Sequence, residues 1–116
     1  MNIQIFGTKK SSDTRKAERW FKERRVKAQF IDLADKRISR GELRSVAACC
    51  GGLEALLDED ARDRDALALV KYTAAAQRED VLLENPQVLR QPIVRNGRRA
   101  AVGYCPEVYE GWLKEG

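Results

Sequence analysis

One segment carries the strongest structural signals in the chain: Phe6-Gly7-Thr8-Lys9-Lys10-Ser11-Ser12-Asp13-Thr14-Arg15-Lys16-Ala17-Glu18-Arg19-Trp20. Where it begins, residues 1–6 place apolar side chains alternately at Ile3 and Ile5, as a short strand does. Gly7 ends this alternation, and from Ala17 onward apolar residues recur at helical spacing. The segment therefore predicts a polar loop held between a strand and a helix.

The predicted loop has the chemistry of a weak anion site. Residues 11 to 14 are all favoured helix N-cap types, so the helix should begin near them with its first unpaired N–H groups facing the loop. A positive helix end beside lysines attracts anions, although the carboxylate of Asp13 can cap the same N–H groups and weaken the effect. Five residues are predicted to contribute to anion binding: Lys9, Lys10, Ser11, Ser12 and Asp13.

The pattern Phe-Gly-x-Lys-x-Ser-x-x-Thr-Arg-Lys-Ala-x-x-Trp over residues 6–20 resembles the start of the arsenate reductase (ArsC) and Spx family of thioredoxin-like proteins. In that family's usual motif, Tyr-x-x-x-x-Cys-x-x-Cys/Ser/Thr-x-Lys-Ala, the first cysteine corresponds to Ser11 and the second position to Thr14. The resemblance implies an α/β, thioredoxin-like fold with a mixed four-stranded sheet and an inserted helical block. It also implies that the catalytic cysteine is replaced by Ser11.

A second segment supports the same resemblance. Leu-Arg-Gln-Pro-Ile-Val at residues 89–94 is similar to the family's Leu-x-Arg-Pro-Ile/Val-x-Val, in which the proline is normally cis and faces the active-site loop. The resemblance implies a cis Pro92, with Gln91 in place of the family arginine. Arg90 lies one residue earlier, which in an extended chain points its side chain to the opposite face. A further family arginine corresponds to about Gly103.

The resemblance extends over nearly the whole chain and implies a single domain of 116 residues. Residues 1–34 and 88–116 are predicted to form the thioredoxin-like sandwich, and residues 38–86 the helical insertion. Apolar spacing and turn signals predict the remaining elements. Before the insertion they are a first helix that ends near Lys27 and a strand over residues 28–33.

Four elements are predicted within the insertion: a helix capped by Ser39 and ended by Gly51-Gly52, a turn over residues 53–57, a helix over residues 65–77 that buries Leu67, Val70 and Ala74, and a turn over residues 80–83. After it come a hairpin with an Asn96-Gly97 turn and a helix over residues 106–114 that packs through Val108, Tyr109 and Trp112.

The insertion departs from the family in one place. The family's Gly-x-Glu-x-Leu-Leu-Asn is followed by Arg-x-Gly-Thr-x-x-Arg/Lys, whereas this chain continues over residues 58–65 as Asp-Glu-Asp-Ala-Arg-Asp-Arg-Asp. The threonine-bearing half is missing. Arg62 or Arg64 is a candidate for the family arginine that binds an oxyanion in this region. A solvated position within the run of alternating charges is the favoured alternative.

The composition narrows the possible functions. The 22 basic and 18 acidic residues give a net charge of +4, and their even spread favours a mixed solvated surface over direct nucleic-acid binding. No apolar run approaches the length of about 18 residues that a bilayer requires, and the N-terminus begins directly with a predicted strand, so we expect a cytoplasmic protein. The chain has no histidine, which excludes imidazole catalysis and disfavours a metal site.

Two functions remain open. Reduction of arsenate or of a glutathione adduct requires a thiolate, which Ser11 cannot supply. The favoured function is a non-catalytic regulatory or protein-binding role without a cofactor, as the resemblance implies from Spx-type members, which bind RNA polymerase, and from nitrogenase-associated members. The alternative is an arsenate reductase-like oxidoreductase that uses glutathione and another thiol. Cys105 is the candidate because it precedes a helix opened by Pro106, whereas the adjacent Cys49 and Cys50 are expected to be reduced thiols.

Overall fold

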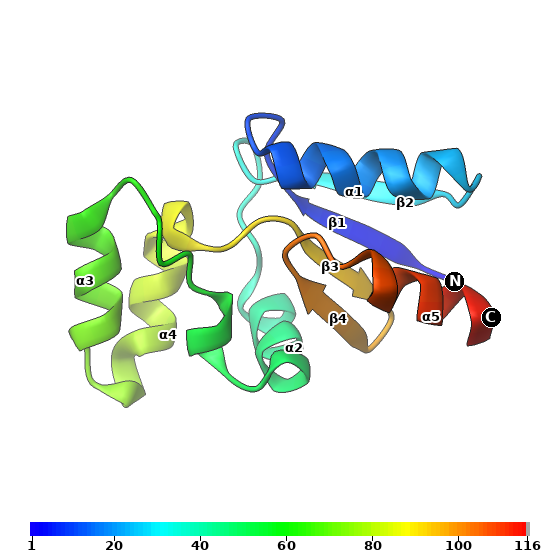
Figure 1. The fold of residues 1–116 in the computed structure, drawn as a ribbon. Coiled ribbons are helices and arrows are strands. Elements are labelled where there is room, and N and C mark those ends of the chain that lie inside the picture. The colour runs from blue at the N-terminus through cyan, green and yellow to red at the C-terminus, as the bar shows by residue number, and fades with distance from the viewer. Residues whose placement is uncertain (116) are drawn as a thin grey trace.

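The computed structural model describes residues 1–115, and a four-stranded mixed sheet lies at its centre (Figure 1). The strands are β1 (Ile3–Gly7), β2 (Ala28–Asp32), β3 (Ile93–Asn96) and β4 (Arg99–Val102), in the spatial order β2-β1-β3-β4. β1 pairs in parallel with β2 and antiparallel with β3, which in turn pairs antiparallel with β4. The predicted α/β fold with a mixed four-stranded sheet is confirmed.

Helices cover both faces of the sheet because successive strand side chains point in opposite directions. The helices that pack on it are α1 (Ser12–Glu23), α2 (Arg40–Cys50) and α5 (Pro106–Glu115). Ile3 and Ile5 pack on one face with Trp20 of α1 and Trp112 of α5. Phe6 points to the other face and joins the cluster formed with α2. This two-sided burial explains why β1 is apolar at nearly every position.

The first helix is shorter than predicted. It ends at Glu23 rather than near Lys27, and Arg25 adopts a left-handed conformation with a φ of 59°. The N–H of Val26 donates to the carbonyl of Phe21 over 3.0 Å, which closes the helix end in the manner of a left-handed C-terminal cap. The chain lacks a glycine there, so the stop signal was not visible in the sequence.

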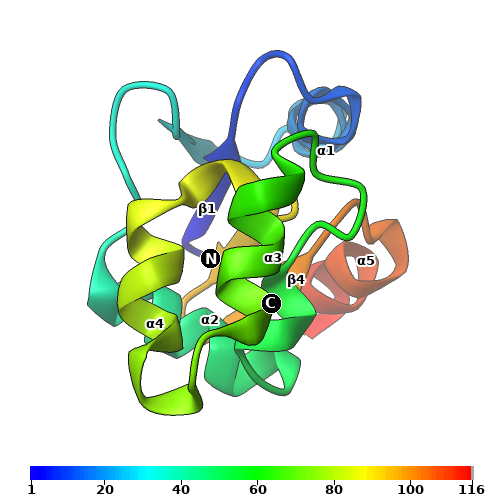
Figure 2. The same cartoon turned by 90° about the vertical axis from the view of Figure 1, so that its left-hand side faces the viewer.

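The part of the inserted block that follows α2 contains two α-helices, whereas the sequence predicted one helix over residues 65–77 and a separate turn over residues 80–83. Its elements are the 3-10 helix η1 (Leu53–Leu56), α3 (Arg64–Tyr72), α4 (Ala75–Glu84) and the 3-10 helix η2 (Pro86–Val88), and Figure 2 shows α3 and α4 side by side. α3 ends because the guanidinium of Arg78 donates to the carbonyls of Lys71 and Thr73, over 3.3 and 3.1 Å. Ala74, predicted to be buried, is exposed in the resulting break.

The parts of the predicted insertion have different roles in the fold. α2 begins at a capping box, in which Ser39 and Glu42 cap each other's backbone N–H groups, and packs against β4 on the sheet. α3 and α4 extend away from the sheet and form one end of the molecule (Figures 1 and 2). Among residues 1–115, no helix combines the length and apolar character needed to cross a bilayer.

Two local predictions at the C-terminal end need correction. The β3–β4 hairpin turns on Gly97 and Arg98, because Asn96 still pairs with Arg99; Gly97 takes the positive φ of 62° at the first central position. In α5, the predicted packing residue Val108 is 41% exposed, whereas Tyr109 is fully buried beneath the helix.

Candidate functional site

Ser11 is the N-cap of α1 and ends the loop that connects β1 with this helix. Its hydroxyl oxygen accepts a hydrogen bond from the N–H of Thr14 over 3.2 Å, and its own N–H donates to the carbonyl of Thr8 over 3.1 Å. The first-turn N–H groups of Ser12 and Asp13 have no acceptor within residues 1–115. The hydroxyl of Ser11 is therefore engaged in capping, and the two N–H groups beside it find no acceptor among residues 1–115.

Gln91 closes the loop from the opposite side. The Gln91-Pro92 peptide bond is cis, as predicted. The side-chain oxygen of Gln91 accepts from the Thr8 N–H over 2.7 Å, from the Thr8 hydroxyl over 3.1 Å and from the Thr14 hydroxyl over 3.4 Å. A neutral amide oxygen thus takes three donors at the junction of strand and helix, where a bound anion would otherwise compete for them.

Gly7 lets the strand end approach the helix closely. A Cβ at this position would lie 2.4 Å from the hydroxyl oxygen of Thr14 and 2.7 Å from its methyl carbon, and both residues are fully buried or nearly so. The requirement at Gly7 is therefore space rather than an unusual backbone angle. The sequence marked Gly7 only as the end of the strand pattern, and no local signal pointed to its contact with Thr14.

The two lysines of the loop face different parts of the molecule. The ammonium of Lys9 pairs with both carboxylate oxygens of Glu18, over 2.9 and 3.0 Å, and lies 4.4 Å from the centre of the Phe30 ring. Lys10 instead lines a cleft beside Ser11 and Gln91. The structure thus brings together only Lys10, Ser11, Ser12 and Asp13 of the predicted anion-binding set, since the side chain of Lys9 points elsewhere.

The cleft runs from the β1–α1 loop to the inserted block. Its main part has a volume of about 650 Å³ and continues into a second hollow beside Ser12 and Asp13. Charged side chains of both signs line the two parts: Lys10, Arg62 and Arg90 are basic, and Asp13, Asp58, Asp60 and Asp63 are acidic. The cleft is therefore not the purely basic pocket that favours a multiply charged oxyanion.

Of the three arginines considered in the sequence, Arg62 and Arg90 line this cleft and Arg64 does not. Arg62 lines it, whereas the guanidinium of Arg64 donates to the carbonyls of Glu59 and Ala61, over 2.8 and 3.2 Å, and supports the chain before α3. Asp63 caps α3 by accepting from the N–H of Ala66, and a hydrogen bond from Gln87 is the main reason that the pKa of its carboxyl is lowered.

Arg90 does not point away from the site as the extended-chain argument predicted. It lines the cleft together with Gln91, because residues 90–92 lie outside any strand and strict alternation does not apply to them. Its guanidinium also lies beside Gly103, where a Cβ would be only 2.8 Å from one of its nitrogens. Arg90 therefore occupies space next to the position where the resemblance placed a family arginine.

The three cysteines are free thiols, and their surroundings disfavour a reactive one at Cys105. Burial is the main cause of the raised pKa of the Cys105 thiol, and the negative charge of Glu107 adds to it. The thiol donates to the carbonyl of Val102 over 3.3 Å. Burial likewise raises the pKa of Cys50. Within residues 1–115, no group of three potential metal ligands comes together.

Known proteins with related sequences or similar structures share this arrangement of strands and helices. Global transcriptional regulator Spx 2 of Lactococcus lactis subsp. lactis (strain IL1403) is 25% identical over 113 residues, which cover 96% of this chain and 86% of that protein. Among solved structures, a putative ArsC family related protein from Bacteroides fragilis matches with a TM-score of 0.82 at 19% identity, and an arsenate reductase from Vibrio cholerae with 0.81 at 20%; each match covers 96% of this chain and 97% of the other. These likenesses show the ArsC-type thioredoxin-like fold. A model of the ArsC family matches residues 6–112, and so the chain belongs to the ArsC family.

Proposed function

We propose that this ArsC-family chain is a redox-inactive, regulatory protein that acts in the cytoplasm by binding another protein. The observation that carries the proposal is the polar network at the start of α1. Ser11 stands at the nucleophile position and caps the helix, while Gln91 accepts hydrogen bonds from Thr8 and Thr14. The strand, loop and helix that form the site are kept, but a serine hydroxyl stands where reduction would need a thiol.

The chemistry of reduction explains why this replacement matters. Arsenate reduction requires a thiolate that attacks arsenic and later forms a disulfide or mixed disulfide. A helix N-terminus lowers the pKa of a cysteine and thereby supplies that thiolate. A serine hydroxyl at the same place cannot exchange sulfur bonds, whatever its surroundings. The free N–H groups of Ser12 and Asp13 still favour weak binding of small anions.

The charges of the cleft also oppose an oxyanion substrate. Four aspartates line the two parts of the cleft, against three basic side chains. Gln91 replaces an arginine of the family pattern, which removes a cation from the cleft that Ser11 also lines. A multiply charged oxyanion would meet repulsion from the aspartates without the fixed positive groups that stabilise charge in a reaction of this kind.

The named relatives support a protein-binding role. Two Lactococcus relatives are global transcriptional regulators of the Spx type, and each match covers 86% of the relative's length. The resemblance to Spx-type proteins implies a protein partner such as RNA polymerase. The mixed charges of the surface favour protein over nucleic acid as the direct partner. Capture of partners from the native cell, with the purified chain as bait, identifies that protein.

An activity assay tests the loss of redox function. The unmodified protein should not reduce arsenate with glutathione and glutaredoxin. Ser11→Cys should create a thiol with a pKa below that of Cys105, because it lies at a helix N-terminus beside Lys10. It should not restore full turnover, because the oxyanion-binding arginines at positions 91 and 103 are still missing. Labelling rates measured against pH, with each modified peptide identified by mass, separate these two steps.

Efficient arsenate reduction by the unmodified protein would overturn the proposal. The remaining candidate would then be a glutathione-dependent reductase that uses Cys105, and Cys105→Ser would abolish its activity. The raised pKa of the Cys105 thiol argues against that outcome, because a protonated thiol is a poor nucleophile.

A further inference from the structure

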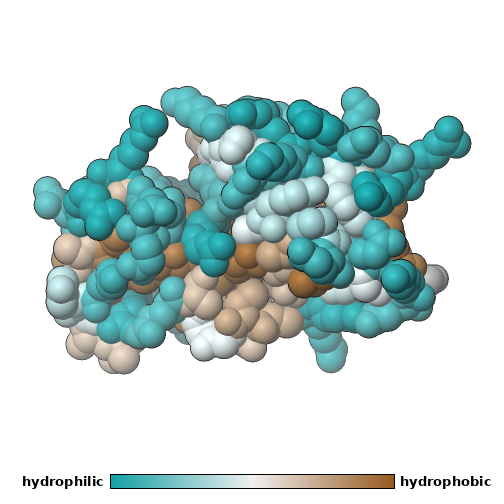
Figure 3. Space-filling view, in the orientation of Figure 1, coloured by the Kyte–Doolittle hydropathy of each residue, from teal (hydrophilic) through white to brown (hydrophobic). Residues whose placement is uncertain are grey.

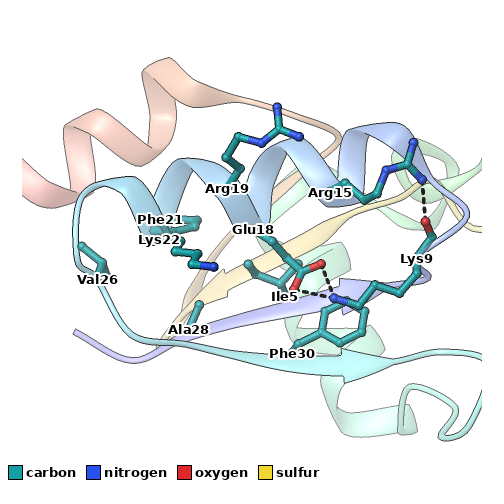
Figure 4. Close-up of a pocket in the computed structure, with 10 residues that line it drawn as sticks. All are labelled: Ile5, Lys9, Arg15, Glu18, Arg19, Phe21, Lys22, Val26, Ala28 and Phe30. Atoms are coloured by element: carbon teal, nitrogen blue, oxygen red, sulfur yellow. Dashed lines mark hydrogen bonds and ion pairs between the residues drawn. The ribbon is translucent and has the colours of Figure 1, made fainter.

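A separate hollow lies between α1 and the edge strand β2 (Figure 4). We call it the α1–β2 groove. It has a volume of about 520 Å³, and its lining is Ile5, Lys9, Arg15, Glu18, Arg19, Phe21, Lys22, Val26, Ala28 and Phe30. It shares no lining residue with the cleft beside Ser11. The two sites are therefore distinct.

The floor of the α1–β2 groove is apolar and partly open to solvent. Val26 and Phe30 are half-buried, and Ala28 is exposed. Within the described residues β2 pairs only with β1, so the backbone N–H and C=O groups along its outer side have no strand partner. An unpaired edge beside an apolar hollow is the geometry that accepts an added strand from another chain.

The rim of the groove is basic. Arg15, Arg19 and Lys22 lie three and four residues apart along α1, and all three line the groove. In Figure 4 the ammonium of Lys22 points toward β2, the guanidinium of Arg15 donates to the carbonyl of Lys9, and the guanidinium of Arg19 points away from β2. Lys9 approaches from the loop and is paired with Glu18, the only carboxylate in the lining. Hydrophilic side chains cover α1 on the face seen in Figure 3 as well. Four cations against one carboxylate leave the rim with an excess of positive charge.

We propose that the α1–β2 groove binds an acidic segment of a partner protein, extended along β2 as an additional strand. Alternate side chains of an added strand point to the same face. Because Ala28 and Phe30 pair with Ile3 and Ile5 on the face of the sheet that α1 covers, the side chains of the added strand that point to this face would reach both the apolar floor and the cations of the rim. The positive charge of the rim favours a negatively charged segment, and the unpaired edge of β2 favours an extended one.

Other occupants fit these contacts less well. A second copy of this chain would bring one basic rim against another, and like charges would repel. Single-stranded nucleic acid binds through stacking on open aromatic rings. The exposed face of Phe30 is covered by the ammonium of Lys9, 4.4 Å from the ring centre, and the other aromatic residue of the lining, Phe21, is fully buried. An acidic peptide needs no free ring.

The inference rests on the proposed protein-binding function, but its test is independent of redox activity. A binding measurement on the groove gives the same result whether or not arsenate is reduced. If the protein reduced arsenate and still bound an acidic peptide here, only the proposed function would fail. If it lacked activity and bound no peptide, only the groove assignment would fail.

The probe is the seven-residue peptide Leu-Thr-Glu-Thr-Leu-Thr-Glu, whose leucine and glutamate side chains all point to one face of an extended strand, added to the full chain labelled with ¹⁵N. Amide shifts should concentrate in β2 and along the Arg15 to Lys22 face of α1, and amide exchange should slow in β2. Peptides with lysine in place of glutamate, or serine in place of leucine, should bind at least about tenfold more weakly. A difference of that size corresponds to the loss of several charge pairs or of the apolar contacts.

Two variants locate the site. Arg19→Glu with Lys22→Glu should weaken peptide binding about tenfold or more, because it reverses two exposed charges on the rim. Lys16→Glu is the matched control, since Lys16 is an exposed cation of the same helix outside the lining, and it should leave the affinity within about twofold. Equal loss in both variants, shifts centred on the Ser11 loop, or tighter binding of an oligo-thymidine than of the acidic peptide would each overturn the proposal.

Discussion

Replacing Gln91 by alanine tests whether its side-chain oxygen holds the strand–helix junction together. The change removes the acceptor for the Thr8 N–H, the Thr8 hydroxyl and the Thr14 hydroxyl. Thr8 is half-buried, so water can replace its lost partner. Thr14 is fully buried, and its hydroxyl would be left without an acceptor.

The magnitude follows from that difference in exposure. A buried polar group without a partner costs about 1–3 kcal/mol, and the 3.4 Å separation between Thr14 and Gln91 places this bond toward the weak end. We therefore expect Gln91→Ala to lower the free energy of unfolding by about 1–2 kcal/mol. Gln77→Ala is the control, because the side chain of Gln77 is exposed on α4 and makes no hydrogen bond among residues 1–115, and it should change stability by less than about 0.5 kcal/mol.

Urea unfolding followed by tryptophan fluorescence measures these changes, since Trp20 and Trp112 are buried. A double-mutant cycle identifies the bond responsible. In a Thr14→Val background the donor is already gone, so Gln91→Ala should cost clearly less than it does in the unmodified protein. An equal cost in both backgrounds would refute the role given to Gln91, as would a loss below about 0.5 kcal/mol for the single variant.

Three further outcomes are expected. Gly7→Ala should destabilise the protein by about 1–3 kcal/mol, measured by urea unfolding, because the new Cβ would lie 2.4 Å from the Thr14 hydroxyl. Tyr109→Phe should cost about 1 kcal/mol at neutral pH, where the buried hydroxyl donates to a backbone carbonyl. Burial raises the pKa of Tyr109 above its usual 10.0, so its contribution is present below pH 10 and lost as the pH rises further; the gap between the two proteins in a pH series should shrink there. Iodoacetamide at pH 8 should modify the exposed Cys49 before the two half-buried cysteines, and mass analysis that found Cys105 modified first would contradict the thiol assignment.

The sheet and the position of the loop were predictable because their signals are local. Apolar side chains alternate at Ile3 and Ile5 as in a strand, Gly7 ends this pattern, and helix-capping residues follow from Ser11. The cis bond before Pro92 came from the resemblance rather than from spacing. The contacts of Gln91 with Thr8 and Thr14 were not predictable, because they join residues about eighty positions apart and depend on how the chain leaves the inserted block.

The errors in the helices share a cause. α1 ends at an arginine in a left-handed conformation, and α3 ends where Arg78 takes over its last carbonyls. In both places a long side chain or an uncommon backbone angle replaces the glycine or proline that normally marks an end. Sequence reasoning therefore placed the helices but not their boundaries.

The side chains of Lys9 and Lys10 point in different directions, and this affects both the cleft and the α1–β2 groove. In an oxyanion site both ammonium groups would face the start of α1. Here Lys9 is held by Glu18 and Phe30 on the groove side, and only Lys10 remains beside Ser11. A cysteine restored at position 11 would therefore depend on the helix end and one lysine for its lowered pKa. The same arrangement leaves one lysine beside Ser11 and adds a cation to the groove, as the proposed recognition of an acidic partner requires.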